Sequence, residues 1–180
     1  MKDDPESNEK IQTKVPSLGF MASGWSGGVS LPHGLPHVSD EMCGLVDIVH
    51  EFLQSSPILP YDPREHRGIW RIMTVRMSQR TKQCMVIIQH SPPTGGMGKR
   101  TDGSDDYTHI FESEKQRLIH LLTEKDLPLP QRSIGVPSMK SSDEEKDQQV
   151  SGIRVTSIFF QEFDGLSHPS PDHPVQVCTI

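Results

Sequence analysis

The sequence predicts an α+β fold, a two-layer sandwich in which helices cover one face of a mainly antiparallel sheet. Two segments place apolar residues at helical spacing, and three others show the alternation or the continuous apolar run of a strand. With a glycine-broken extended segment near residues 19–31, these elements follow the order β-α-β-β-α-β. That order is typical of a split-βαβ, ferredoxin-like sandwich.

The first helix is predicted to begin at Ser39, a good N-cap residue that Asp40 and Glu41 follow. Carboxylates in the first turn favour the positive end of a helix. Pro57 limits the helix at its other end. The apolar stripe that predicts this helix consists of Met42, Leu45, Val46, Val49, Phe52 and Leu53.

Two strands and a turn are predicted next. Residues 70–77 alternate, with Trp70, Ile72 and Thr74 on one face and Arg71, Met73, Val75 and Met77 on the other. After a polar turn at 78–82, residues 84–88 form a continuous apolar run, which favours a strand covered on both faces. The pair therefore predicts a hairpin.

A second, weaker helix is predicted over residues 110–122 and a third strand over residues 153–160. Three polar stretches interrupt or precede the domain: a disordered leader at 1–14 and flexible insertions at 91–106 and 127–149. We therefore expect one central α+β domain at 15–177, with long disordered insertions and a divergent tail at 178–180.

The composition excludes several classes of protein. The net charge of −6 gives no overall basic character for autonomous nucleic-acid binding. No apolar run is long enough for a membrane span, and the first ten residues lack the apolar core of a signal peptide. Three widely spaced cysteines predict a reduced, intracellular chain, cytoplasmic or nuclear, with no membrane partner.

The residues that could carry chemistry give weak signals. His33 and His37 are four apart, but the prolines and glycine around them exclude an aligning helix, so we expect no metal site. Cys43 and Cys84 are predicted to be core residues, because both lie in apolar segments. No phosphate-binding or nucleophile motif occurs, and we expect no catalytic or cofactor-binding residue in this chain.

A local basic cluster is the main candidate site. Its members on the predicted hairpin could contact an RNA backbone, or they could be solvated charges that discourage edge pairing. An RNA-recognition-motif sheet is disfavoured, since the strand at 83–90 lacks stacking aromatics. The RNA-contact candidates are Arg71, Arg76, Arg80 and Lys82.

Several segments resemble the RNA (uracil-5-)-methyltransferase family, and within it the eukaryotic tRNA enzymes, including plant versions. The most specific is the string from Tyr61 to Ser78, YDPREHRGIWRIMTVRMS, which resembles a Y-D-P…G-x-W…L-T-V-R-x-S pattern of those enzymes. Weaker likenesses occur at 15–21, 49–56 and 153–160.

This resemblance implies the central domain of an enzyme that uses S-adenosylmethionine, a cysteine thiolate attacking uridine C6, and a base that removes the C5 proton. Because the chain shows no methyl-donor loop or downstream catalytic cysteine, we expect a truncated form that is inactive alone. The expected partners are tRNA, bound weakly, and the missing catalytic domain or another protein at an exposed apolar surface. A non-enzymatic protein-interaction or RNA-binding module is the alternative.

Overall fold

The computed structural model describes residues 15–21, 28–95, 106–124, 153–165 and 174–178. The predicted leader at 1–14, the insertion at 127–149 and most of the insertion at 91–106 lie outside these residues, as do residues 179–180 of the predicted tail. At the ends of the first insertion, Thr94 and Asp106 form an antiparallel bridge. This bridge brings both ends of the segment to one place on the domain.

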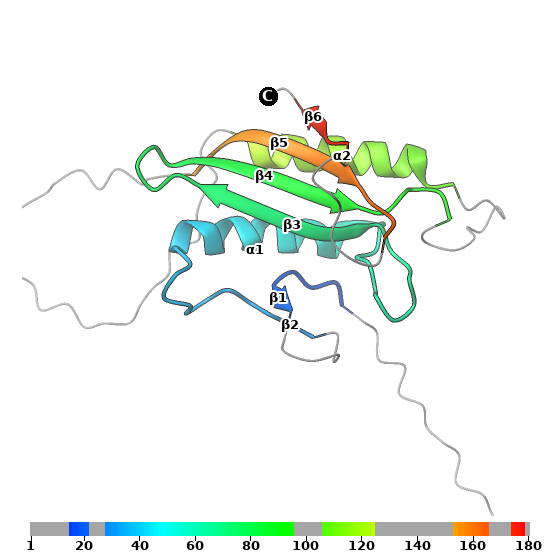
Figure 1. The fold of residues 1–180 in the computed structure, drawn as a ribbon, viewed down its shortest axis with the longest axis horizontal. Helices are drawn as coiled ribbons and strands as arrows, with labels where there is room; N and C mark the ends of the chain where they lie inside the picture. The colour runs from blue at the N-terminus through cyan, green and yellow to red at the C-terminus, as the bar shows by residue number, and fades with distance from the viewer. Residues whose placement is uncertain (1–14, 22–27, 96–105, 125–152, 166–173, 179–180) are drawn as a thin grey trace, which may run out of the picture.

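The fold is α+β, as the sequence predicts, with a four-stranded sheet and two helices packed on one of its faces (Figure 1). The sheet has the strand order β3-β4-β5-β6, and both helices have sixteen residues. A small second sheet pairs β1 with β2. The elements are β1 (Phe20–Met21), β2 (Val29–Ser30), α1 (Asp40–Ser55), β3 (Trp70–Met77), β4 (Gln83–His90), α2 (Thr108–Thr123), β5 (Arg154–Glu162) and β6 (Gln176–Cys178).

The start of α1 confirms the predicted N-cap. The Ser39 hydroxyl accepts a hydrogen bond from the Met42 backbone N–H at 3.3 Å, so it satisfies a donor that has no partner within the helix. Helix α2 has no such cap at Tyr107; the Asp106 carboxylate accepts instead from the Thr108 N–H at 2.8 Å. Both predicted helices are present, and each extends slightly beyond its predicted apolar stripe.

The core lies between the helices and the sheet. It is made by residues of α1, α2 and alternate positions of the strands, with a T-shaped contact between Phe52 and Trp70 at its centre. In β4, only the residues at 84, 86, 88 and 90 are buried, and those between them are partly exposed or exposed. The prediction that this strand is covered on both faces is therefore wrong, because the helices pack on one side only.

The strand pairing departs from a split-βαβ arrangement. β3 and β4 form the predicted antiparallel hairpin, and β6 is antiparallel to β5, but β4 and β5 are parallel neighbours joined through α2. A split arrangement would need the early extended segment inserted between them. That segment instead forms the exposed β1–β2 pair, since its two-residue strands are too short to complete a central position.

A β-bulge changes which residues of β3 are buried. The register shifts between Trp70 and Ile72, so Trp70 enters the core on the same side as Met73, Val75 and Met77. The predicted grouping of Trp70 with Ile72 and Thr74 is therefore wrong. One extra residue at a bulge is enough to reverse the alternation of a strand.

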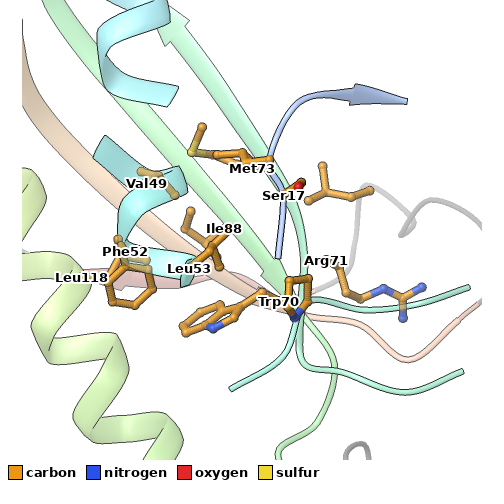
Figure 2. Close-up of a pocket in the computed structure, with 12 residues that line it drawn as sticks. Ser17, Val49, Phe52, Leu53, Trp70, Arg71, Met73, Ile88 and Leu118 are labelled. Atoms are coloured by element: carbon orange, nitrogen blue, oxygen red, sulfur yellow. The ribbon is translucent and has the colours of Figure 1, made fainter. Parts of the chain in front are cut away.

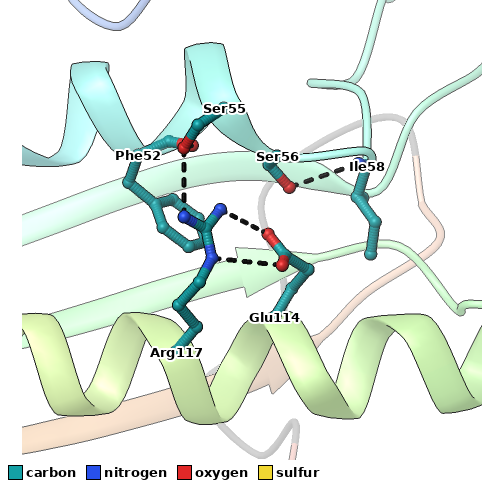
Figure 3. Close-up of polar contacts among 6 residues, drawn as sticks. All are labelled: Phe52, Ser55, Ser56, Ile58, Glu114 and Arg117. Carbon is teal, nitrogen blue, oxygen red and sulfur yellow. Dashed lines mark hydrogen bonds and ion pairs between the residues drawn. The ribbon is translucent and has the colours of Figure 1, made fainter.

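A polar contact joins the two helices above the core (Figure 3). The Arg117 guanidinium donates to both carboxylate oxygens of Glu114, at 3.1 and 2.7 Å, and to the Ser55 hydroxyl at 3.0 Å. Its carbon lies 4.3 Å from the centre of the Phe52 ring. This bidentate pair orients Arg117 across the gap between α2 and the end of α1.

Among the residues that the structure describes, neither helix has the length and hydropathy that crossing a lipid bilayer requires.

Candidate functional site

The loop before β3 carries the most specific part of the resemblance, and it has a defined backbone geometry. Tyr61 N–H donates to the Trp70 carbonyl at 2.7 Å, and Asp62 N–H donates to the Arg67 carbonyl at 2.7 Å. Gly68 has φ of +102°, and a Cβ built there would lie 2.1 Å from the Pro60 carbonyl oxygen. The loop therefore closes as a tight hairpin that only glycine permits at this position.

Arg71 lies beside this loop and binds the chain just after β5. Its guanidinium donates to the carbonyl oxygens of Phe163 at 2.8 Å and Gly165 at 2.7 Å. The same group lies 4.1 Å from the centre of the Tyr61 ring. Arg71 is half-buried, and these contacts join two loops that are about a hundred positions apart in sequence.

The other three RNA-contact candidates lie near the far end of β3: Arg76 is in the strand, and Arg80 and Lys82 are in the turn that follows it. Lys82 donates to the Glu41 carboxylate at 2.8 Å, an ion pair that lowers the pKa of Glu41 through this hydrogen bond. Arg76 and Arg80 are exposed, and the part of the chain that the structure describes gives neither a carboxylate partner. Arg154 begins β5 next to Gln83 and is also exposed, so it adds a third exposed cation at this end of the sheet.

The four predicted candidates thus do not form one cluster. Arg71 is separated from Arg76 by five positions of an extended strand, roughly 17 Å at strand rise. The exposed cations near the turn of the β3–β4 hairpin are Arg76, Arg80 and, in addition, Arg154. Arg154 escaped the sequence argument because only the pairing of β5 with β4 brings it there.

A small cavity lies between α1, β3 and the segment before β1 (Figure 2). Its volume is about 60 Å³, and its lining is mostly apolar. Leu18 is held beside it by a hydrogen bond from its N–H to His50 Nδ1 at 3.1 Å. A site for a nucleotide-sized cofactor needs several hundred Å³, so this cavity is a packing gap. The residues that Figure 2 places around it include Val49, Phe52, Leu53, Trp70, Met73, Ile88 and Leu118.

The cysteines and histidines have structural surroundings. Cys43 and Cys84 are buried, as predicted, and burial raises the pKa of the Cys84 thiol to about 11. His33 Nε2 lies 2.8 Å from an Asp47 carboxylate oxygen, in an ion pair if the ring is protonated. Within the described ranges, no three or more His, Cys, Asp or Glu side chains gather as metal ligands.

Sequence reasoning missed one aromatic side chain. Phe159 lies in the middle of β5, partly exposed, while its neighbour Phe160 is buried in the core. Adjacent residues of a strand point to opposite faces, so two consecutive phenylalanines in a predicted strand must place one ring away from the helices. This aromatic signal lies on β5, outside the strand at 83–90 whose lack of aromatics disfavours an RNA-recognition-motif sheet.

Comparisons with known proteins give two related matches. The chain is 31% identical over 85 residues to the mouse protein "tRNA (uracil-5-)-methyltransferase homolog A", a match that covers 46% of this chain and 14% of that protein. It is 32% identical over 79 residues to the human protein of the same name, covering 42% of this chain and 12% of the human one. The matched part is thus about a seventh or less of the length of these relatives. No protein-family model and no solved structure matches the chain.

Proposed function

We propose that this chain is an RNA-facing central domain of a tRNA (uracil-5-)-methyltransferase-like protein. The observation that carries the proposal is the 31% identity over 85 residues to a protein named for that activity. The Tyr61–Trp70 loop supports it as well. The glycine of the G-x-W pattern is Gly68, whose positive φ and close approach to Pro60 leave no room for a side chain. A kinship with plant members and a cytoplasmic or nuclear location belong to this proposal.

The exposed arginines are the groups proposed to contact RNA phosphates. Arg76 and Arg80 are exposed and lack carboxylate partners in the described part of the chain, so they can bind phosphate without breaking an existing ion pair. Lys82 would first have to leave Glu41, and Arg71 would have to leave two carbonyl oxygens. The two arginines therefore carry more of the proposed contact than the other two candidates.

Methyl transfer is proposed to need protein beyond this chain. The mechanism implied by the resemblance requires a thiolate nucleophile; Cys43 and Cys84 are buried, and Cys178, which is partly exposed, lies at the end of the edge strand β6. The raised pKa of Cys84 leaves about one thiol in a thousand ionised at pH 8. S-Adenosylmethionine would accordingly bind elsewhere in the longer protein.

Binding to unfractionated tRNA tests the proposed contact. We expect the wild-type chain to bind with a dissociation constant that rises with salt, because cations on the protein replace ions on the phosphates. Replacing Arg76 and Arg80 together by glutamine should lower the slope of log K against log salt by roughly 1 to 2. Lys82→Gln, as the matched control, should change it much less. Equal slopes for all variants would contradict the assignment.

A methylation assay tests the second part of the proposal. The pure chain is incubated with tRNA lacking 5-methyluridine and labelled S-adenosylmethionine, beside a full-length enzyme of the related kind as a positive control. We expect label in RNA only with the full-length enzyme. Turnover by the chain alone would refute the proposed separation of RNA contact from catalysis.

A protein-docking role is the second candidate, favoured by the exposed apolar residues of the β1–β2 pair. Phe20 is 53% exposed and Met21 80% exposed, although a two-stranded sheet gains little stability by itself. The proposed occupant is the remaining part of the longer protein. Replacing both residues by serine should reduce self-association in size-exclusion chromatography and weaken binding of a separately expressed catalytic domain. An unchanged affinity for that domain would exclude this surface.

A further inference from the structure

Within the part of the chain that the structure describes, one face of the four-stranded sheet has no helix packed on it. Strand register places side chains of all four strands in cross-strand rows on this side, opposite the core. We call it the open face and define it by Ile72, Thr74, Arg76, Met85, Ile87, Gln89, Ser157, Phe159, Gln161 and Val177.

Phe159 occupies the middle of this face. Its row runs from Thr74 through Ile87 and Phe159 to Val177, one residue from each strand. Val177 is 64% exposed and the ring of Phe159 is partly exposed. A rigid strand thus presents one aromatic ring among smaller neighbours, which is the geometry on which a planar base can stack.

The neighbouring rows add polar groups beside the apolar side chains of Ile72 and Met85. Gln89 Nε2 donates to Gln161 Oε1 at 2.9 Å across β4 and β5; Gln161 is only 9% exposed, and the partly exposed Gln89 is the more accessible of the two amides. The row on the other side contains Arg76, Met85 and Ser157. Amides and a hydroxyl beside an aromatic ring suit the polar edges of a base better than the side chains of an apolar helix.

Charge separates the two sides of the domain. The chain has a net charge of −6, yet the open face as defined contains no carboxylate and includes Arg76. Five ion pairs of the described residues have their carboxylates on α1, on α2 or on the residue just after α2: Glu41, Asp47, Glu112, Glu114 and Glu124. A polyanion is therefore the ligand that matches this surface in charge.

From these observations we infer that the open face binds single-stranded RNA, with an unpaired base stacked on Phe159 and the adjoining phosphate contacted by Arg76. The inference rests on the proposed RNA-facing function and adds where and in what form RNA binds. Bases in a duplex are already stacked and paired, so a paired stem would not use this ring.

Fluorescence anisotropy with a labelled 12-nucleotide oligouridylate and a labelled 12-base-pair RNA duplex tests the inference on the full chain. Phe159→Leu keeps an apolar side chain and removes the aromatic plane. We expect it to weaken binding of the single strand about tenfold without changing the salt slope. Arg76→Gln should lower that slope by about 0.7, the value for one phosphate contact on a single strand. His109→Leu, which removes an exposed ring from helix α2, is the control and should bind as the wild type does.

The outcomes separate this inference from the proposed function. Wild-type affinity in Phe159→Leu, or equal binding of duplex and single strand, would overturn the stacking site while leaving an RNA-facing domain possible. No binding of either RNA or of tRNA by the wild type would overturn both. A Phe159→Leu variant that loses self-association but not RNA binding would assign the open face to a second copy of the chain.

A second measurement does not depend on a folded variant. The wild-type chain is photocrosslinked to an oligomer containing 4-thiouridine, and the crosslinked peptide is identified by mass spectrometry. We expect the crosslink within β5 at Phe159. Crosslinks confined to the helices would contradict the inference.

Discussion

Phe159 and Phe160 are neighbours on β5, but they belong to opposite sides of the sheet and to different chemistry. Phe160 is 1% exposed, contacts His90 and lies 5.1 Å from the Lys115 ammonium. Phe159 lies on the open face between Ile87 and Val177. The side of the sheet that faces the helices, which we call the covered side, uses its rings for packing, whereas the open face leaves the Phe159 side chain partly exposed.

Charges follow the same division. On the covered side, the Lys115 side chain is almost fully buried and donates to Glu112 at 3.3 Å and to Gln176 on β6 at 2.6 Å. Such pairs satisfy charges within the helix layer. An acidic chain can therefore present a sheet face without carboxylates, and net charge alone is a poor guide to what one face can bind.

The largest expected effect is a difference in stability between the two phenylalanines. Phe160→Ala should lower the free energy of unfolding by about 3 to 5 kcal/mol, because it leaves a cavity in the core. Phe159→Ala should lower it by about 1 to 2 kcal/mol, because its side chain is partly exposed and its removal leaves no closed cavity in the core. Urea unfolding followed by circular dichroism measures both. Similar losses would show that the open face is packed as tightly as the covered face.

The second prediction concerns the loop before β3. This loop is hydrogen-bonded to Trp70, whose side chain lies in the core. Gly68→Ala combines a left-handed φ with a backbone clash at Pro60, so we expect a loss of about 3 kcal/mol. Gly34→Ala is the matched control: Gly34 has φ of +83° but nothing within 4 Å of a built Cβ. Its expected loss is about 1 kcal/mol. Equal losses would mean that the close approach to Pro60 contributes nothing.

The helices could be predicted from the sequence because their signals are local. The stripe from Met42 to Leu53 and the cap at Ser39 lie within one segment and act within it. The hairpin was predictable for the same reason, since a five-residue turn joins two strands with strong β propensity.

The features that escaped prediction depend on distant partners. The bulge at Trp70 reverses one strand, and the parallel pairing of β4 with β5 depends on where the early segment lies. β6 has three residues, and it exists through pairing with β5 and the contact of Gln176 with Lys115. The hydrogen bonds from Arg71 to the carbonyls of residues 163 and 165 could not be predicted, because these residues are distant in sequence and only the fold brings them beside Arg71.

The smallest expected effect is a pH dependence that only the covered side should show. His90 is buried against the Phe111 ring, with centroids 4.5 Å apart, and desolvation lowers its pKa below the usual value near 6.5. Between the lowered pKa and 6.5, the unfolded chain binds the proton and the folded chain does not. The contribution of His90 to stability is therefore complete above pH 6.5 and declines as the pH falls toward its folded pKa.

Urea unfolding from pH 7.5 to 5 should show this decline in the wild type and a flatter profile in His90→Gln. His109→Gln removes an exposed imidazole from α2 and should keep the wild-type profile. If His90→Gln and the wild type lose stability in parallel, His90 is not the group responsible, and the covered side does not hold this ring as a neutral core residue.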